Sequence, residues 1–199
     1  MKKLIFIPFI GLILFMQMAS AQTDQPKDYR NFPIIVTLQF HSLTTPFRNL
    51  KSNFRNIGIG IGTEVSYFDS PNWVQQFNIL WYHNKAVGNG LMLYTQAAWR
   101  PELFAFTYGE IKAGLGCLIS NRPSKSFIKN NGHWISVGRK GKAMLTLPVG
   151  ISLGYQDYSE QTYLSPFISY QVMLLKGYNQ TIPIVPESLL QIGTRIHSK

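Results

Sequence analysis

Residues 57–68 read IGIGIGTEVSYF, a stretch in which two kinds of side chain alternate. One set is apolar and mostly β-branched and ends in Tyr67, whereas the other is glycine followed by Glu64. A period of two residues is typical of a β-strand, because successive side chains leave its backbone on opposite faces. Glycine and a carboxylate form a face that is too thin and too polar for an ordinary core. The stretch therefore predicts a strand of a β-barrel in a lipid bilayer, with its apolar face outside.

The N-terminus carries the pattern of an export signal. Two lysines precede a short apolar run, and Ala19–Ala21 then provides a cleavage pattern of small residues. We predict a signal peptide over residues 1–21 and one outer-membrane β-barrel domain over residues 22–199. A transmembrane anchor helix is the alternative, and the short run and the cleavage pattern disfavour it. Nothing later in the chain is apolar for long enough to be a spanning helix, so a membrane location requires strands.

The composition narrows the remaining classes of protein. The chain of 199 residues carries 19 Lys and Arg against 9 Asp and Glu, a formal net charge of +10. Such a charge alone would suggest nucleic acid, but the export signal argues against that partner, and the basic residues are concentrated in predicted loops. Cys117 is the only cysteine, which excludes an internal disulfide and a cysteine metal cluster. The four histidines are widely separated, so we expect no metal site and no cofactor.

Eight segments alternate in this manner and predict eight strands, each long enough for a tilted span of a thin bilayer. They are Pro33–His41, Asn56–Phe68, Trp73–Asn84, Gly90–Arg100, about Phe104–Leu118, Lys142–Tyr155, Tyr163–Lys176 and Ser188–His197. Connections two, four and six are short, connections one, five and seven are longer, and connection three is of moderate length. Short turns on one side and long loops on the other are typical of outer-membrane barrels, whose turns are periplasmic. An even number of strands then places both termini on the periplasmic side.

Four large aromatic residues give a second indication of a membrane barrel. Tyr67, Trp73, Trp99 and Tyr155 all belong to outward-facing sets, and all lie at strand ends beside the short turns. Aromatic residues gathered at one edge predict an interfacial girdle. The alternative is a soluble sandwich or a lipocalin-like barrel, but such a barrel should show polar outer faces.

These patterns predict an all-β fold, namely a closed antiparallel up-and-down transmembrane β-barrel of eight strands. With its strand at 56–64 and a final strand in which Gln191, Gly193 and Ile196 fit a polar-x-Gly-x-x-apolar pattern, the chain resembles small eight-stranded outer-membrane β-barrel proteins of Gram-negative bacteria. Its style is most similar to that of the small barrels of the Bacteroidetes group. It departs from them at the very end, where residues 197–199 replace the usual final aromatic. The resemblance implies an outer-membrane location among outer-membrane lipid and lipopolysaccharide.

The inward-facing sets of these strands contain charges and amides. The charged residues are Glu64, Arg100, Glu110, Lys112 and Arg195, and the amides are Gln39, Gln76, Gln96, Gln171 and Gln191. An eight-stranded barrel is only wide enough for its own side chains to fill it, and buried charges must be paired. We expect a polar plug that stiffens the barrel, in which each glutamate pairs with Lys112 or an arginine. A narrow or gated ion path is the alternative.

Two predicted loops are basic and contain no acidic residue. The fifth connection carries Arg122, Lys125, Lys129, Arg139 and Lys140, and the first carries Arg48, Lys51 and Arg55. If both are extracellular, the outer rim is positive and suits an anionic partner, such as lipopolysaccharide phosphates, acidic glycans or an acidic protein surface. Phe127 and Trp134 interleave with these charges and would stack on sugar rings or enter the lipid interface. A generic solvated loop near lipid head groups is the alternative.

A lipid-modifying barrel enzyme would need a serine, a histidine and a carboxylate together at the membrane-facing rim. The candidates are His41, Ser42, His83, His133 and Ser136. We expect no acidic residue beside any of them, and the nearest acidic candidate by loop level is Glu187. They match no barrel-enzyme motif. We therefore predict a non-enzymatic structural or surface barrel, or an accessory subunit of a larger outer-membrane assembly. A lipid A- or phospholipid-modifying enzyme and a narrow ion or small-solute pore remain as alternatives.

Overall fold

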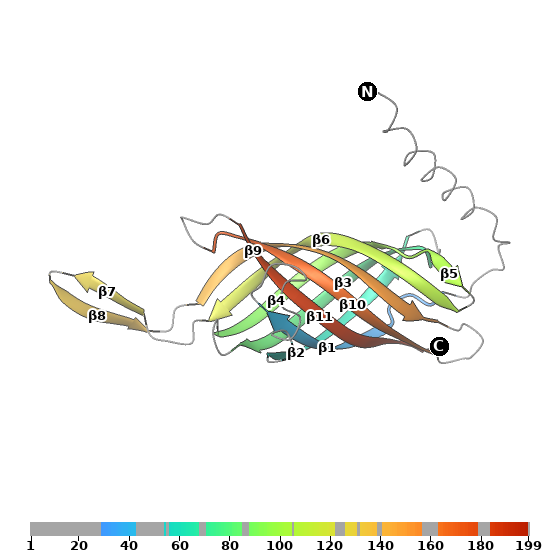
Figure 1. Ribbon diagram of the computed structural model, residues 1–199, viewed down its shortest axis with the longest axis horizontal. Coiled ribbons are helices and arrows are strands. Elements are labelled where there is room, and N and C mark those ends of the chain that lie inside the picture. The colour runs from blue at the N-terminus through green and yellow to red at the C-terminus, as the bar shows by residue number, and fades with distance from the viewer. Residues whose placement is uncertain are drawn as a thin grey trace, which may run out of the picture.

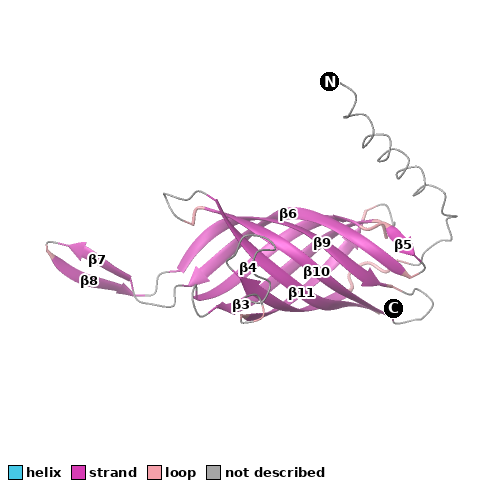
Figure 2. Ribbon diagram, viewed as in Figure 1, coloured by secondary structure: helices cyan, strands magenta, loops and turns pink. Residues whose placement is uncertain are grey.

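The computed structural model describes a chain made of β-strands (Figures 1 and 2). The described residues are 29–42, 54, 56–67, 71–84, 88–104, 106–121, 126–130, 132–138, 141–156, 163–178 and 184–198. Within these ranges no helix is long and apolar enough to cross a membrane.

Eight long strands form the body of the structure. They are β1 (Ile34–Ser42), β2 (Ile57–Ser66), β3 (Trp73–Asn84), β4 (Gly88–Trp99), β6 (Thr107–Asn121), β9 (Gly141–Tyr155), β10 (Tyr163–Lys176) and β11 (Ile184–His197). Three shorter strands accompany them: β5 (Glu102–Phe104) pairs with the start of β6, while β7 (Ser126–Asn130) and β8 (His133–Gly138) pair with each other.

The long strands close into a single antiparallel barrel. Each pairs with its neighbours along the chain, and the first and last strands pair from Ile34 opposite Ile196 to Ser42 opposite Ser188. Figure 1 shows the β7–β8 hairpin projecting beyond one end of the barrel and the C-terminus at the other. We name these the outer end and the inner end. The predicted fold class, a closed eight-stranded antiparallel barrel, is confirmed.

The Ile-Gly stretch forms β2, and its two faces differ as predicted. The isoleucines are exposed on the outside of the wall, whereas Gly58 and Gly60 are buried. In the register with β1, Gly58 lies opposite Gln39 and Gly60 opposite Thr37. A Cβ atom built at Gly60 would lie 2.4 Å from the Gln39 Nε2 atom and 2.5 Å from the Thr37 Oγ1 atom. The glycines thus leave the room that the inward side chains of the neighbouring strand occupy.

Gly58 provides a direct test of this close packing. Its Cβ would lie 2.6 Å from the backbone oxygen of Trp81 and 2.8 Å from the Tyr82 Cβ atom, so Gly58→Ala must displace β3. We expect the free energy of unfolding to fall by about 1–3 kcal/mol, measured by denaturant titration of the barrel refolded in lipid vesicles. The neighbouring outward change Ile59→Val is the control and should cost less than about 1.5 kcal/mol. Equal stability of the two variants would contradict the packing.

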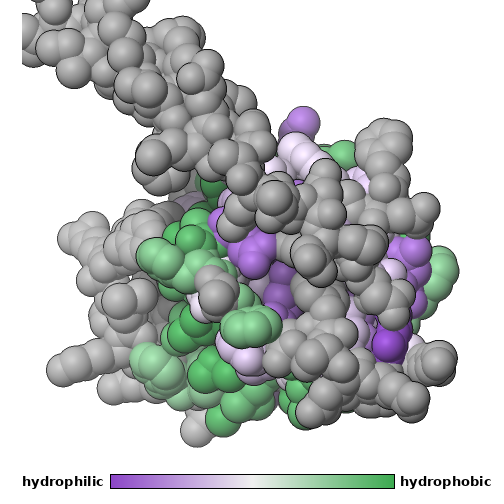
Figure 3. All heavy atoms as spheres, turned by 90° about the vertical axis from the view of Figure 1, so that its right-hand side faces the viewer, coloured by the Kyte–Doolittle hydropathy of each residue, from purple (hydrophilic) through white to green (hydrophobic). Residues whose placement is uncertain are grey.

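The outside of the barrel is apolar along most of its length. Its exposed large side chains include Ile34, Val36, Leu38, Ile61, Phe77, Ile79, Leu93, Leu115, Leu147, Ile151, Leu153, Leu164, Ile168 and Ile192. Figure 3, which looks onto the inner end, shows hydrophobic residues gathered on a flank of the barrel and hydrophilic residues nearer its middle. This arrangement inverts that of a soluble barrel, which shows polar outer faces.

Several strand limits differ from the predicted ones. β6 runs on to Asn121, and β11 begins at Ile184 rather than at Ser188. The early part of β11 pairs with β10 alone, because its pairing with β1 starts only at Ser188. This part of β11 is therefore an edge strand, where Pro186 is tolerated although it has no N–H to donate. The β7–β8 hairpin lies in the fifth connection, which was predicted to be a loop throughout.

Candidate functional site

The barrel interior contains charged side chains near its inner end. Arg100 and Arg195 each contact both carboxylates, with Arg100 Nη2 2.7 Å from Glu64 Oε2 and 2.8 Å from Glu110 Oε2. Arg195 Nε lies 3.1 Å from Glu64 Oε2, and its Nη2 lies 2.9 Å from Glu110 Oε2. Lys112 Nζ is 3.4 Å from the other oxygen of Glu110. The sequence predicted each of these residues inside the barrel, and the structure brings all five together with almost no exposure to solvent.

Aromatic and neutral polar groups complete this charged cluster. The centroid of the Tyr108 ring lies 5.1 Å from the guanidinium carbon of Arg100 and 5.5 Å from that of Arg195. The Tyr108 hydroxyl also accepts a hydrogen bond from Arg195. Gln76 donates to both carboxylates, and the Ser152 hydroxyl donates to Glu110. Buried charges remain tolerable only when such partners satisfy them.

The segment before β1 lies across the inner end of the barrel. The Tyr29 hydroxyl donates to Glu64 Oε1 at 2.8 Å, and the Tyr29 ring packs edge-on against His197. The Arg30 carbonyl oxygen lies 3.2 Å from His197 Nδ1. The guanidinium group of Arg30 lies over the Tyr163 ring. Burial, followed by the Glu64 carboxylate, raises the pKa of the Tyr29 hydroxyl well above its usual range, so that it remains a donor. This segment covers the charged cluster from the inner side.

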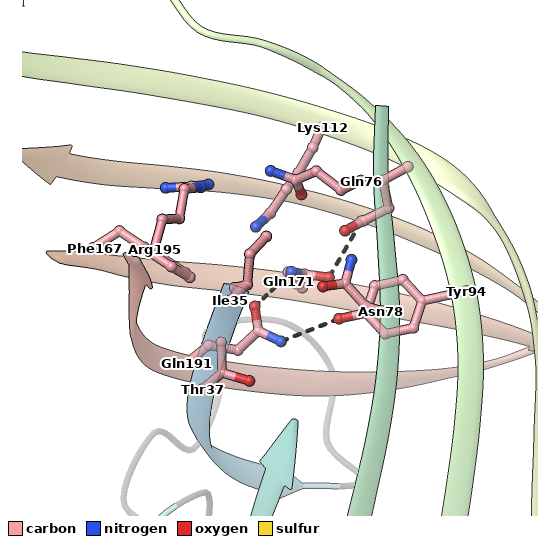
Figure 4. A pocket seen from close by; sticks show the side chains of 11 residues that line it. Ile35, Thr37, Gln76, Asn78, Tyr94, Lys112, Phe167, Gln171, Gln191 and Arg195 are labelled. Atoms are coloured by element: carbon pink, nitrogen blue, oxygen red, sulfur yellow. Dashed lines mark hydrogen bonds between the residues drawn. The ribbon is translucent and has the colours of Figure 1, made fainter. Parts of the chain in front are cut away.

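A chain of side-chain hydrogen bonds joins inward amides in the middle of the barrel, and Figure 4 shows its link between Gln171 and Gln191. Gln96 donates to Gln171 at 3.3 Å, Gln171 donates to Gln191 at 2.5 Å, and Gln191 donates to Gln39 at 3.1 Å. Gln39 donates in turn to the Thr37 hydroxyl at 3.0 Å. Four strands therefore contribute their inward amides to one connected set.

A small cavity lies between the amides and the charged cluster. It is lined by Ile35, Thr37, Gln76, Asn78, Tyr94, Gln96, Lys112, Phe167, Gln171, Gln191 and Arg195, most of which Figure 4 labels. The volume open to the centre of a water molecule is about 10 Å³, which is roughly what one ordered water needs.

Apolar side chains fill the barrel on the outer side of the amides. This buried cluster comprises Leu80, Tyr82, Met92, Tyr94, Leu118, Met144, Met173, Leu175 and Leu189. From the inner end outward, the interior thus holds a charged cluster, a chain of amides and an apolar cluster.

A histidine–carboxylate pair lies beyond the apolar cluster. His41 Nε2 is 2.9 Å from Glu187 Oε2, the Tyr82 ring stacks on the imidazole at 4.1 Å, and Asn84 Nδ2 lies 3.1 Å from His41 Nδ1. The expectation that no acid lies beside these histidines is therefore wrong for His41. The expectation was wrong because β11 begins earlier than predicted, so that Glu187 lies on a strand inside the barrel and not in a loop.

The serines near this pair belong to the opposite face of the wall. Ser42 follows His41 and Ser188 follows Glu187 in their strands, and successive strand residues point to opposite sides. The Ser188 hydroxyl accepts a hydrogen bond from Tyr170 instead. The pair is a base with its carboxylate, but neither serine is placed to act as its nucleophile.

The remaining histidine candidates lie elsewhere. His83 is exposed on β3, with its Nδ1 2.6 Å from Asn89 Oδ1. His133 and Ser136 are exposed on β8. Among the described residues, no three His, Cys, Asp or Glu side chains lie close enough to hold a metal ion.

The four aromatics of the predicted girdle lie on the outside of the barrel. Tyr67, Trp73, Trp99 and Tyr155 are all exposed, and the rings of Trp73 and Trp99 are 6.3 Å apart. The Tyr67 amide donates to the Trp73 carbonyl across the turn between β2 and β3. All four lie at the inner end of the barrel.

Most of the predicted basic loop residues lie outside the described residues. These are Arg48, Lys51, Arg55, Arg122, Lys125, Arg139 and Lys140. Lys129 is described and lies on β7, directly opposite Trp134 on β8.

Comparison with known proteins supports the fold. No protein-family model matches the chain, and no curated protein sequence matches it. Neisserial surface protein A, a solved structure, is similar with a TM-score of 0.56 at 10% identity, covering 83% of this chain and 96% of the other. The N-terminal β-barrel domain of Pseudomonas aeruginosa OprF has a TM-score of 0.50 at 13% identity, covering 84% of this chain and 99% of that domain. At such identities the likeness concerns the fold alone.

Proposed function

We propose that this protein is a non-enzymatic barrel of the Gram-negative outer membrane with a structural or surface role, or with the role of an accessory subunit in a larger outer-membrane assembly. The observation that carries the proposal is the filled interior, where charged, amide and apolar side chains succeed one another from the inner end to the outer end. Such an interior stiffens the wall, so contacts with lipid and with other proteins are left to the outside of the barrel. The signal peptide over residues 1–21 directs export, and the basic loops face outer-membrane lipid and lipopolysaccharide.

The apolar outside and the aromatic residues at the inner end support the membrane location. Lipid tolerates a spanning sheet only when it closes on itself, as this one does. The similarity to a Neisserial surface protein and to a Pseudomonas barrel domain adds support of the same kind.

The two alternative functions find less support in the interior. A pore needs a continuous path, whereas the cavity here has space for about one water molecule. A lipid-modifying enzyme needs a nucleophile beside its base, and the His41–Glu187 pair has neither Ser42 nor Ser188 on its face.

Three measurements on the full-length protein test the proposal together. We expect heat-modifiable migration from the membrane fraction, no discrete conductance steps in planar bilayers, and an unchanged lipid A acyl pattern in expressing cells. Recovery in the soluble periplasm would refute the membrane location. Conductance steps would establish a pore, and an altered acyl pattern would establish an enzyme. Gentle detergent extraction should co-purify a larger outer-membrane partner, and a solitary barrel would refute the accessory role.

A further inference from the structure

The charged cluster contains more cations than anions. Arg100, Arg195 and Lys112 stand against only two carboxylates, those of Glu64 and Glu110, and all five side chains are buried. A buried charge without a counter-charge is very costly, because the interior excludes the water that would otherwise solvate it. Among these described side chains, one positive charge therefore remains to be balanced.

Lys112 is the least closely paired of the three cations. Its Nζ lies 3.4 Å from Glu110 Oε1, an oxygen that also accepts a hydrogen bond from the Ser152 hydroxyl. The two arginines, by contrast, each contact both carboxylates at distances between 2.7 and 3.1 Å. The Phe167 ring, with its centroid 5.7 Å from Nζ, adds only a cation–π contact. The unbalanced charge is therefore centred on Lys112.

The cavity between the charged cluster and the amides lies beside this amine. Lys112 and Arg195 both line it, and Figure 4 shows them together with the amides that complete the lining. Its volume of about 10 Å³ open to the centre of a water molecule is enough for roughly one water. A chloride ion without its hydration shell is of similar size, whereas sulfate and phosphate are larger. The size and the charge of this cavity together suit one halide ion.

The chain of amides begins at this cavity with an unsatisfied atom. Gln96 lines the cavity, and its Oε1 atom is buried without a hydrogen-bond partner among the described residues. Each amide offers both an acceptor and donors, so half-turns of the four amides reverse the chain, and the Thr37 hydroxyl then donates to Gln39. The Gln96 Nε2 atom thereby takes the position of the unpartnered oxygen. Its N–H needs an acceptor there, which an anion in the cavity provides.

We propose that this cavity binds a chloride ion, held by Lys112, Arg195 and the amide of Gln96. The ion balances the excess positive charge and accepts a hydrogen bond from the amide. A water molecule would satisfy Gln96 in either direction of the chain, but it carries no charge and leaves Lys112 unbalanced. The inference goes beyond the proposed function, because it concerns an ion held inside the barrel and not the partners of its outside.

Urea titration of the full-length barrel in lipid vesicles tests this inference, with chloride replaced stepwise at constant ionic strength by gluconate, which is too large for the cavity. Because a ligand of the folded state alone stabilises it by mass action, each tenfold rise in chloride above the dissociation constant should raise the folded-to-unfolded ratio about tenfold. In Lys112→Gln the same rise should change that ratio by less than about twofold. The control Lys142→Gln removes an exposed lysine, whose Nζ donates to the Tyr178 carbonyl, and should keep the full dependence on chloride.

A second measurement locates the ion in the wild-type protein and needs no variant to fold. Crystals grown in bromide should show an anomalous-scattering peak in contact with Lys112 Nζ, and the lack of a peak there would overturn the inference. Wild-type stability that does not respond to chloride would assign the cavity to water, and an equal response in Lys112→Gln would place the anion elsewhere. Heat-modifiable migration and planar-bilayer recordings on the same protein report the proposed function, so its failure is distinguishable from failure of the chloride site.

Discussion

Replacement of Glu110 by glutamine is expected to lower the free energy of unfolding by about 3–5 kcal/mol. Its carboxylate accepts hydrogen bonds from Arg100 and Arg195 and lies 3.4 Å from Lys112 Nζ. Removal of the charge leaves three buried cations to Glu64 alone, in surroundings from which water is excluded. Denaturant titration of the barrel in lipid vesicles measures the loss.

Two further variants show whether the loss comes from the charged cluster. Glu102→Gln removes a carboxylate from β5, where the residue is partly exposed, and should change the stability by no more than about 0.5 kcal/mol. The double variant Glu110→Gln/Lys112→Gln restores the original excess of one positive charge among these residues and should recover about 0.5–3 kcal/mol relative to Glu110→Gln. Wild-type stability of Glu110→Gln would refute the stabilising role of the cluster.

The second large effect is expected on the outside of the barrel, with Ile151→Arg. Ile151 is exposed on β9 and lies four residues from Tyr155, which corresponds to a depth of roughly 10 Å along a tilted strand. This depth is close to the middle of an apolar band about 25 Å tall. An arginine there should lower the free energy of unfolding by about 2–4 kcal/mol in vesicles.

Leu145→Arg on the same strand is the matched control. Leu145 is also exposed but lies ten residues from Tyr155, at roughly 25 Å and therefore near the opposite boundary of the apolar band. Its arginine should cost no more than about 1 kcal/mol. A barrel that stands in water would tolerate both substitutions equally, so equal effects would contradict the membrane location.

The strands of this barrel could be predicted because a period of two persists along each of them. The prediction fell short where that pattern is interrupted. Pro186 obscured the first pairs of β11. The hairpin segments Ser126–Asn130 and His133–Gly138 do not alternate between apolar and polar residues, and their pairing contains a register shift after Ser126. Local alternation carries no information about strands of that composition.

The interior could be predicted as a set of residues but not as a set of contacts. Alternation places Glu64 and Glu110 inside, yet it does not show that Arg100 and Arg195 bridge them across the barrel. The pair of His41 with Glu187, 146 residues apart in sequence, was missed for a related reason. One signal was available: in a closed barrel the first and last strands are neighbours, so inward residues at their outer ends must meet.

The pairing of β1 with β11 has a consequence for how the protein is made. Every other seam joins long strands that are consecutive among the eight, although the β7–β8 hairpin is inserted between β6 and β9. This seam joins residues such as Ile34 and Ile196. We therefore expect this pairing of residues distant in sequence to form late in folding. Until it forms, the unpaired edges of β1 and β11 can pair with strands of other chains, so incomplete barrels are expected to be prone to aggregation.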